Sequence, residues 1–574
     1  MRKGRGSVAR LTRSGALVAA LALVAVAAVG ANTGRASALP TAVGEYVVLY
    51  ADGASAATAR GAVRAAGGTV VAENATVGYA LVHSRDARFV ARASHAPGLD
   101  GVARNAVVGL APKAQPGRRP ERRDAVERPH ARWDPASLSA AAAPEADRGA
   151  PRGEPLAARQ WDMRQIGATP TGSYAVERGR RGVVVGVIDT GIDATHPDLA
   201  PNLDRARSRN FTTDIPLADG PCEVSSCRDP VGVDPFGHGS HVASTIAAPI
   251  NGFGIAGVAP NVTLVDLRAG QDSGLFFLKP TLDALSYAAE IGVDVVNMSY
   301  YVDPWLYNCP DNRADTPAEQ QEQRAVRRAT QRAITYAVRH GVLPVVAAGN
   351  ENEDLGRPTV DATSPDYPPG RAKTRRVDNE CIRVPAETEG VVVVSSTGPS
   401  TRKAYYSNYG TEQTDVAAPG GDVYDAPGSR LAAQSGVLGA YPTALARAEH
   451  ALKPDGTPTT PFVLRDCHGG TCAYYRYMQG TSMAAPHASG VAALIVARYG
   501  SRGRVPVGLA AERTRDVLLA TATPHACPTP RRVIYAQVQP DGSALRSTAS
   551  CVGRRGDNGF YGRGIVDAAR AVRR

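Results

Sequence analysis

Residues Gly182–Ile188 read GVVVGVI, an unbroken run of small and β-branched residues. Such a run is typical of a strand in a parallel sheet that is covered on both faces. Three further runs of this kind follow along the chain, at Thr263–Asp266, Val293–Asn297 and Val342–Ala347. Between them, the patterns at Thr281–Ile291 and Ala318–His340 predict helices. Alternating strands and helices predict an α/β fold, a doubly wound and mostly parallel sheet with helices on both faces.

A smaller unit precedes this domain, at residues 43–112. Its strand-like run Glu45–Tyr50 is followed by an Ala-rich helical stretch, Ser55–Ala66, which ends at two glycines. Two strand-like runs, a helical stretch at Ala87–Ser94 and a last strand-like run complete it. The order β-α-β-β-α-β predicts a small ferredoxin-like α+β domain.

The two units are joined by residues 113–158, where Pro, Ala, Arg and Glu dominate. This composition buries too little apolar surface to order itself, so we expect a disordered linker. The α/β domain then occupies residues 159–574. Within it, residues 421–477 are rich in Pro, Gly and Tyr and are predicted to form a surface insertion. The final YGRGIVDAARAV predicts a closing strand and helix.

The net charge of +11 is concentrated at the front of the 574-residue chain. The first 159 residues carry 22 Lys and Arg against 12 Asp and Glu, whereas the remainder carries 43 against 42. The large domain therefore lacks the basic surface that phosphate backbones require, and nucleic acid is not an expected partner.

The basic start of the chain, MRKGRGSVARLTR, precedes an apolar run at Gly15–Ala31 and a small-residue cleavage signature at Ala36–Ala38. This order predicts a secretory signal peptide over residues 1–38. A single membrane anchor is the alternative, but the run is short for a span and is rich in Ala. No second apolar run follows, so we expect a secreted, extracellular protein without a stable membrane anchor.

The chain contains eight cysteines, an even number, all beyond residue 200. In an oxidising compartment they predict four disulfides, although eight cysteines permit 105 pairings. Proximity in sequence favours Cys222–Cys227, Cys309–Cys381, Cys467–Cys472 and Cys527–Cys551. A four-thiolate zinc site is the alternative, which the long gap between the two C-x4-C pairs disfavours.

Three short motifs place reactive side chains at strand ends or helix starts. They are VIDTGID with Asp189, GHGSHVA with His238, and GTSMAAPH with Ser482. Alone, each residue is more simply explained as a turn or helix cap, and the two histidines of GHGSHVA lack the spacing of a zinc helix. Together they supply an orienting carboxylate, a general base and a nucleophile for acyl transfer.

The three motifs, in this order, resemble the catalytic signatures of the subtilisin-like serine proteases, the subtilases. The resemblance covers about residues 160–574 and implies that Asp189 orients His238 and that His238 activates Ser482. It also implies an oxyanion hole formed by the Asn350 side chain, in VVAAGN, and the Ser482 backbone N–H. The implied activity is that of a secreted serine endopeptidase acting on polypeptide substrates, with no cofactor required for the chemistry.

The resemblance gives residues 43–112 a role as well, since subtilases are made with an N-terminal propeptide of this fold. It implies a latent precursor in which the propeptide is an intramolecular inhibitor, cut somewhere within residues 113–158. We expect a monomer. A structural calcium ion is compatible with the family, but no Asp-rich loop is specific enough to name its ligands, so the metal site is unknown.

The substrate-binding residues implied by the resemblance are Ser299, Tyr301 and Gly349. Tyr301 departs from the family pattern, which has Gly there, so its ring is expected to narrow or reshape the primary pocket. Two other functions remain open. One is a catalytically silent binding module, and the other is an esterase or acyl transferase that uses the same triad.

Overall fold

The structure is a computed structural model that describes residues 43–106, 126–127, 154–425, 427–501, 508–539 and 542–574. The predicted signal peptide and most of the predicted linker lie outside these ranges. Within them, no helix combines the length and the apolar character that a membrane span needs.

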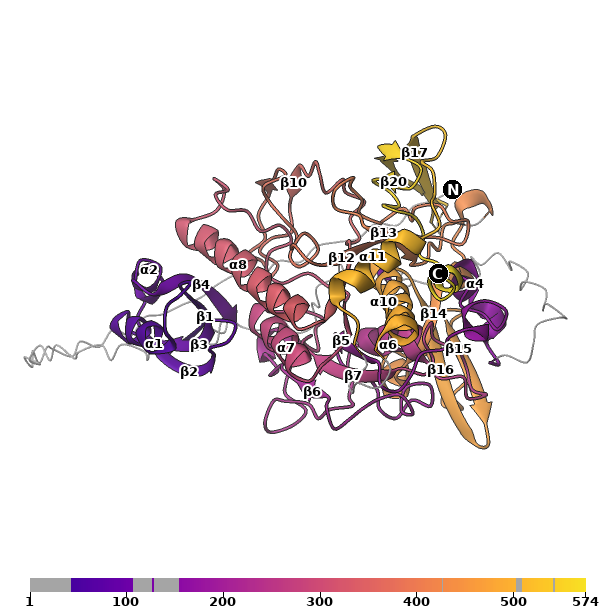
Figure 1. Cartoon of the computed structure of the whole chain (residues 1–574), viewed down its shortest axis with the longest axis horizontal. Helices are drawn as coiled ribbons and strands as arrows, with labels where there is room; N and C mark the ends of the chain where they lie inside the picture. Colours follow the sequence, from indigo (N-terminus) through magenta and orange to yellow (C-terminus); the bar gives the residue numbers. More distant parts are fainter. Residues whose placement is uncertain (1–42, 107–125, 128–153, 426, 502–507, 540–541) are drawn as a thin grey trace, which may run out of the picture. The chain divides into compact units, whose positions relative to one another are not determined.

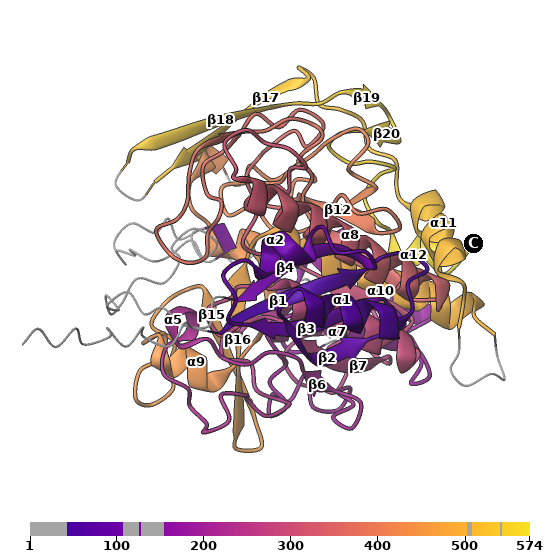
Figure 2. The ribbon, with the colours of Figure 1, turned by 90° about the vertical axis from the view of Figure 1, so that its left-hand side faces the viewer.

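The N-terminal unit is a four-stranded antiparallel sheet with two helices (Figure 2). Its elements are β1 (Gly44–Tyr50), α1 (Ala56–Ala65), β2 (Thr69–Asn74), β3 (Tyr79–Ser84), α2 (Phe89–Ala93) and β4 (Leu99–Ala106). The strand order β2-β3-β1-β4 is that of a ferredoxin-like domain, as the sequence predicts. Ser55 caps α1, because its hydroxyl accepts a hydrogen bond from the Thr58 N–H.

A seven-stranded sheet forms the centre of the large domain, and all its neighbouring strands run parallel (Figure 1). In spatial order the strands are β13 (Val416–Pro419), β12 (Val392–Thr397), β9 (Leu343–Ala347), β8 (Val295–Met298), β5 (Val184–Ile188), β7 (Thr263–Arg268) and β6 (Arg209–Asn210). After β5 the chain adds β6 and β7 on one side and then crosses to add β8, β9, β12 and β13 on the other, so the sheet is doubly wound.

Helices cover both faces of this sheet, and alternate strand residues face opposite sides. Val185 and Val187 of β5 pack in one apolar core, whereas Val184 and Ile188 pack in the other. The first core contains α6 (His238–Ala247), α10 (Thr481–Tyr499) and α11 (Ala511–Thr521). The second contains α7 (Leu278–Glu290) and α8 (Pro317–Arg339). The all-apolar strands are therefore explained by burial on both faces.

The N-terminal sheet packs against α7 and α8. Val47, Leu49 and Ala103 join the apolar core that these helices form. Around this contact, the Arg332 guanidinium pairs with Asp100 at 2.9 Å, and the Tyr79 hydroxyl donates to Asp283 at 2.5 Å. The contact thus combines buried apolar area with a polar rim.

Residues 421–477 were expected to form a surface insertion, but much of the segment is buried. It forms an antiparallel sheet of β14 (Val437–Tyr441), β16 (Thr471–Met478) and β15 (Val463–His468), with the short helix α9 (Thr443–Ala448). All five residues of β14 are buried, because this strand packs against α6. Four of its tyrosines, Tyr441, Tyr474, Tyr475 and Tyr477, lie in β14 and β16 and are buried.

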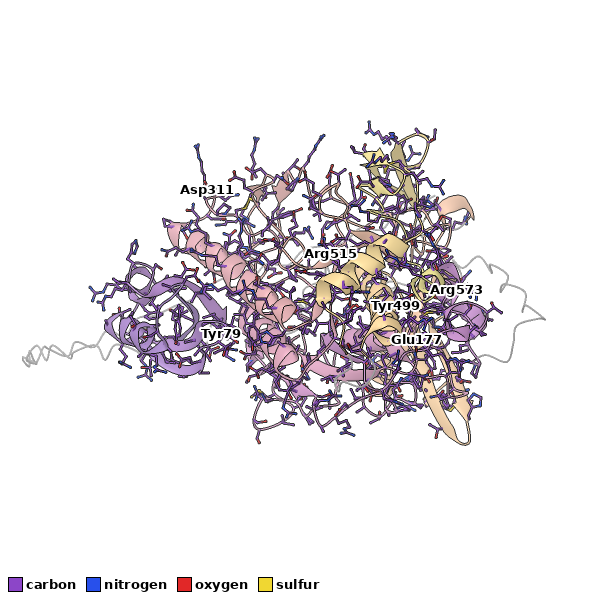
Figure 3. The ribbon with its side chains drawn as sticks, viewed as in Figure 1. Tyr79, Glu177, Asp311, Tyr499, Arg515 and Arg573 are labelled. Atoms are coloured by element: carbon purple, nitrogen blue, oxygen red, sulfur yellow. A yellow bond between two sulfur atoms is a disulfide. The ribbon has the colours of Figure 1, made fainter. Side chains whose placement is uncertain are left out.

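The remaining α-helices and strands are α4 (Trp161–Gln165), α5 (Pro216–Asp219), β10 (Val360–Asp361), β11 (Arg375–Arg376), β17 (Arg532–Val538), β18 (Ala544–Ser550), β19 (Gly553–Arg554), β20 (Asp557–Asn558) and α12 (Ala568–Ala571). In place of the predicted closing strand the chain forms isolated bridges at Gly562 and Ile565, which are followed by α12. Tyr499, at the end of α10, donates its hydroxyl to the carbonyl of Ala571 at 3.0 Å and so ties α12 down (Figure 3).

All eight cysteines lie in the described ranges and form disulfides. The pairs are Cys222–Cys227, Cys309–Cys381, Cys467–Cys472 and Cys527–Cys551. This is the pairing that proximity in sequence favours, and it leaves no cysteine thiol for a zinc site.

Candidate active site

Asp189 follows directly after β5, at the carboxyl edge of the parallel sheet. Its backbone carbonyl accepts hydrogen bonds from the N–H groups of Ala269 and Gly270, both at 3.0 Å. Its carboxylate Oδ1 accepts from the Thr190 N–H at 2.8 Å. The neighbouring loop and the turn after β5 therefore hold this fully buried carboxylate in one orientation.

His238 is the first residue of α6, and its Nδ1 donates to Asp189 Oδ1 over 2.6 Å. The preceding Gly237 has φ +82°, a left-handed conformation that side chains disfavour. A Cβ there would also lie 2.6 Å from the Tyr441 ring. The glycine that precedes His238 is thus required both by the turn and by close packing.

Asp234 connects the start of α6 with the turn after β5, although the sequence analysis did not single it out. Its carboxylate accepts hydrogen bonds from the Gly237 N–H at 2.7 Å, the Ser240 N–H at 2.8 Å and the Thr190 hydroxyl at 2.9 Å. The side chain satisfies N–H groups at the start of α6 and links them to the Asp189 turn. An aspartate four residues before the His238 helix was the signal available in the sequence.

Ser482 is the second residue of α10 and is only 4% exposed. Ser299 contacts it twice: its carbonyl accepts from the Ser482 hydroxyl at 3.2 Å, and its own hydroxyl donates to the Ser482 carbonyl at 3.0 Å. Ser299 lies directly after β8, so the sheet edge and the start of α10 meet here. The positive end of the helix dipole lies at this serine.

Asn350 lies three residues after β9 and is oriented by Thr481. Its Oδ1 accepts from both the N–H and the hydroxyl of Thr481, at 2.8 and 2.9 Å. With the oxygen held in this way, the amide Nδ2 is left to donate elsewhere. It donates to Glu127 Oε1 at 3.1 Å.

Glu127, from the predicted linker, lies among these side chains. Its Oε1 accepts from the Ser482 hydroxyl at 2.7 Å as well as from Asn350, and its Oε2 is 3.5 Å from His238 Nε2. Its backbone carbonyl accepts from the Gln479 N–H at 3.3 Å. One carboxylate therefore contacts the serine, the histidine and the asparagine. The sequence analysis missed Glu127, because nothing in a Pro- and Arg-rich linker distinguishes one acidic residue from its neighbours.

Tyr301 lies two residues after Ser299, and Gly349 directly precedes Asn350. The Tyr301 hydroxyl donates to Asp366 Oδ2 at 2.8 Å, which fixes the ring. Gly349 has φ +101°, and its N–H donates to the Thr481 hydroxyl at 3.0 Å. The site residues that the sequence predicts are Asp189, His238, Ser299, Tyr301, Gly349, Asn350 and Ser482. Five of them contact one another or Glu127: Asp189, His238, Ser299, Asn350 and Ser482.

Two further histidines near the motifs are structural. Burial lowers the pKa of His241 to about 3, so its ring is neutral and donates from Nε2 to the Val437 carbonyl at 3.0 Å. His487, at the end of the serine motif, pairs with the buried Asp162 at 3.0 Å. These contacts fasten α6 and α10 to neighbouring segments.

Comparison with known proteins decides the family. Residues 180–564 match the peptidase S8 subtilase family. The chain belongs to the subtilase family. At the level of the family it is thus a subtilisin-like serine protease.

The subtilase relatives include a thermophilic serine proteinase of Bacillus sp. (strain AK1), which is 29% identical over 353 residues. That match covers 61% of this chain and 61% of the relative, so the chain spans less than two thirds of its length. Subtilisin DY of Bacillus licheniformis is 27% identical, over 59% of this chain and 84% of that protein.

A solved structure with the same fold is the epidermin leader peptide processing serine protease of Staphylococcus aureus. It has a TM-score of 0.59 and 20% identity, and the match covers 92% of this chain and 98% of that one. At this identity the likeness shows the fold alone.

Proposed function

We propose that this subtilase is a secreted serine endopeptidase, made as a latent precursor, that hydrolyses peptide bonds through an acyl-enzyme. The observation that carries the proposal is the meeting of Asp189, His238, Ser482 and Asn350 around the Glu127 carboxylate. The orienting carboxylate contacts the base directly, while the nucleophile and the amide donor both contact the one carboxylate that lies beside the base.

In the proposed reaction, Ser482 Oγ attacks the scissile carbonyl carbon and His238 takes the hydroxyl proton. Asp189, through its 2.6 Å hydrogen bond to Nδ1, keeps Nε2 free to receive that proton and stabilises the imidazolium. His238 then gives the proton to the leaving amine, which completes the acyl-enzyme. Water enters by the same general-base step and releases the acid.

The developing oxyanion would be stabilised by the Asn350 amide and the Ser482 N–H. Glu127 Oε1 supports this assignment, since a negatively charged oxygen already lies within hydrogen-bond distance of Asn350 Nδ2. Thr481 fixes that amide before the substrate arrives, and donors fixed in advance are the effective ones in such sites.

Latency follows from the same contact. The Ser482 hydroxyl donates to Glu127, so its proton is directed away from His238, and the oxyanion position is filled. We propose that residues 43–112 are the propeptide and hold the adjoining linker in the cleft through their packing on α7 and α8. Cutting or displacing the linker would remove Glu127 and expose the triad.

The secreted location rests on the predicted signal peptide at residues 1–38, and the polypeptide substrates rest on the family. We propose a restricted substrate range, because Tyr301 stands where the resemblance implies the wall of the primary pocket and Asp366 holds its ring in place. A broad, casein-degrading cleavage profile would contradict this restriction.

The test of function is labelling of the secreted chain with a fluorophosphonate probe. We expect Ser482→Ala to abolish labelling, and the processed protein to cleave internal bonds of peptides with blocked ends. A folded, processed protein that never labels would support the silent binding module instead. Preference for ester over peptide substrates would support the acyl transferase or esterase.

Latency is tested separately on the uncut precursor. Glu127→Ala should label faster than the parent precursor, by at least tenfold, because the hydroxyl and the oxyanion site become free. Glu512→Ala, an exposed position on α11, is the matched control and should label at the parent rate. Equal rates for the parent and Glu127→Ala would contradict the role of Glu127 while leaving the triad proposal intact.

A further inference from the structure

Strands β17 and β18 form an antiparallel two-stranded ribbon in the C-terminal part of the chain (Figure 2). The Cys527–Cys551 disulfide closes the base of the ribbon, because Cys551 follows directly after β18. On the inner face, Tyr535 and Ala549 are buried in an apolar core of the large domain. The ribbon is therefore anchored at its base and along one face.

The outer face of the ribbon is basic and carries one large apolar side chain. Alternate residues of a strand point to the same face. This face therefore carries the side chains of Arg532, Ile534, Arg546 and Thr548. Ile534 is 62% exposed, and both arginines are exposed. Among the described residues, neither arginine side chain has a hydrogen bond or an ion pair, and neither strand contains Asp or Glu.

Strand β18 also presents an open edge, since β17 is its one neighbouring strand in the described part of the chain. In an antiparallel pair, alternate residues direct their N–H and C=O groups away from the partner strand. Thr548 is such a residue, because its carbonyl accepts from Asn352 Nδ2 at 3.1 Å. Arg546 lies two residues earlier, so its backbone groups point the same way, where no described residue bonds to them.

This edge lies close to the proposed oxyanion donor. Asn352 is two residues after Asn350, and its side chain bridges to the ribbon. While Asn352 Nδ2 donates to Thr548, its Oδ1 accepts from Lys403 Nζ at 2.9 Å, which fixes the amide. A polypeptide bound at Asn350 would therefore reach Arg546 within about six extended residues.

We propose that the outer edge of β18 binds an acidic, extended segment of the polypeptide substrate, away from the bond that is cleaved. The inference rests on the proposed endopeptidase function. The segment would add a third strand through the open backbone groups of Arg546, and its carboxylates would pair with the Arg546 guanidinium. Arg532, one strand farther, would add longer-range attraction, and Ile534 would contact an apolar side chain.

The open backbone edge favours a polypeptide over other acidic partners. A nucleic acid lacks the alternating N–H and C=O groups that pair with a strand edge. In addition, two arginines neutralise few phosphates, and affinity for nucleic acid depends on the number of phosphates contacted.

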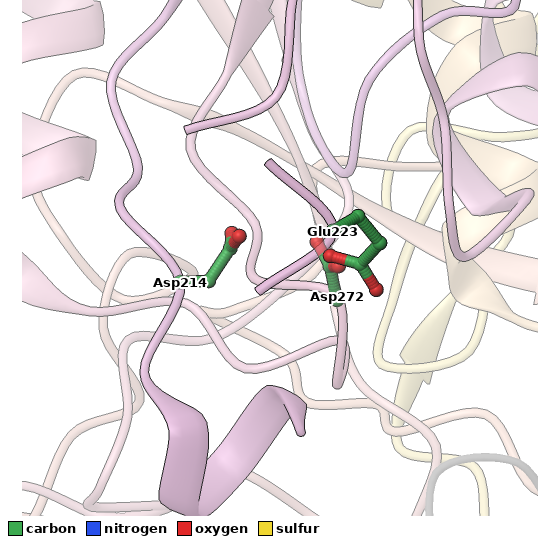
Figure 4. A group of neighbouring side chains, drawn as sticks. All are labelled: Asp214, Glu223 and Asp272. Atoms are coloured by element: carbon green, nitrogen blue, oxygen red, sulfur yellow. The ribbon is translucent and has the colours of Figure 1, made fainter. Parts of the chain in front are cut away.

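A second copy of this chain fits the edge less well than an acidic substrate does. Pairing of β18 with β18 would place like charges opposite one another at Arg546. The acidic cluster Asp214, Glu223 and Asp272, in the loops after β6 and β7, offers little to the ribbon of another copy (Figure 4). Asp214 is buried and Asp272 pairs with Arg268, so of the three only Glu223 is exposed.

Binding at this edge should act on KM. A contact remote from the scissile bond is made equally in the ground state and in the transition state, so it lowers KM and leaves kcat unchanged. Because the charges are exposed, salt should weaken the effect.

The test measures cleavage, by the processed protein, of two peptides with the same cleaved sequence. One has a tail of alternating Glu and Thr, and the other has a tail of alternating Gln and Thr. Each tail is placed on the amino side or on the carboxyl side. We expect the acidic tail to lower KM about fivefold or more on one of the two sides, and added salt to reduce this preference. Equal KM values for the two tails on both sides would overturn the proposal.

The acidic tail alone, titrated by calorimetry into the Ser482→Ala protein, measures binding without catalysis. We expect it to bind, and to bind more tightly than the Gln tail. Binding of the acidic tail to a protein whose parent cleaves neither peptide would contradict the endopeptidase function and not the binding surface. Absence of binding would contradict the surface while leaving the function intact.

Variants decide whether the edge of β18 is used. Arg546→Gln removes the charge, and Arg546→Pro also removes the outward N–H, which β17 does not use. We expect the first to lose most of the preference for the acidic tail and the second to lose all of it, each measured against the Gln tail in the same variant. Arg513→Gln removes an exposed charge on α11 and should keep the parent's preference. An unchanged preference in both Arg546 variants, or a dimer of the parent that both variants abolish, would overturn the assignment.

Discussion

Glu127 Oε1 lies 2.7 Å from Ser482 Oγ, although 355 residues separate the two in sequence. Asn350 Nδ2 lies 3.1 Å from the same oxygen. One carboxylate oxygen therefore lies within hydrogen-bond distance of both the serine and the asparagine, where we propose that a substrate carbonyl oxygen binds. The contact connects the chemistry proposed for the site with the proposed latency, and it makes each residue around it open to test.

Asn350→Ala removes the side chain that we propose as a donor to the oxyanion. In the processed protein we expect kcat to fall about 100-fold to 1,000-fold with little change in KM, since the donor acts mainly in the transition state. Peptide hydrolysis by the variant measures this. Asn261→Ala, at an exposed position, is the matched control. A rise in KM of the same size, with kcat unchanged, would indicate a substrate-binding role instead.

Asp234→Ala removes the acceptor for the N–H groups of Gly237 and Ser240 at the start of α6. We expect the free energy of unfolding to fall by about 2 kcal/mol. Because His238 begins this helix, kcat should also fall, by about tenfold. Asp234→Asn, which keeps one acceptor oxygen, should lie between the parent and Asp234→Ala. Asp204→Ala, at another Asp-capped turn, should leave kcat unchanged.

Asp294 predicts a pH dependence of stability. Burial raises its pKa to about 7, above the value of about 3.9 expected in an unfolded chain. The folded state therefore holds a proton that the unfolded state releases, and stability is lost as pH rises from about 4 to about 7.

Asp294→Asn mimics the protonated form and still accepts from the Val184 N–H. The variant should lack this loss, and its stability relative to the parent should increase by up to about 1.4 kcal/mol per pH unit across that window. Denaturant unfolding at several pH values measures the difference. Asp311→Asn, an exposed position labelled in Figure 3, should follow the parent curve. A difference between Asp294→Asn and the parent that is constant with pH would contradict the prediction.

The disulfides should contribute unequally. Cys309–Cys381 closes a loop with a sequence separation of 72, whereas Cys467–Cys472 spans 5 residues. Loop-closure entropy predicts losses of about 4 and about 2 kcal/mol when each pair is replaced by alanines. The Tm of the two double variants, compared under the same conditions, checks this order. A larger effect from the short pair would show that packing, and not chain entropy, dominates.

Much of the fold could be predicted from local patterns. Hydrophobic periodicity and helix caps predict the buried strand β5, the helices α1, α7 and α8, and the β-α-β-β-α-β order of the N-terminal unit. These signals depend only on residues that are close together in sequence. The segment at residues 421–477 did not follow. Its composition is typical of a loop, yet its strand β14 is fully buried because it packs against α6.

The sequence by itself determined the family, because the motifs around Asp189, His238, Ser482 and Asn350 are long and local. Only the tertiary structure decided which other side chains lie beside them. Glu127 is far from Ser482 along the chain, yet its carboxylate accepts a hydrogen bond from the Ser482 hydroxyl. Such contacts depend on how distant segments pack, and packing is a property of the folded chain that no local pattern contains.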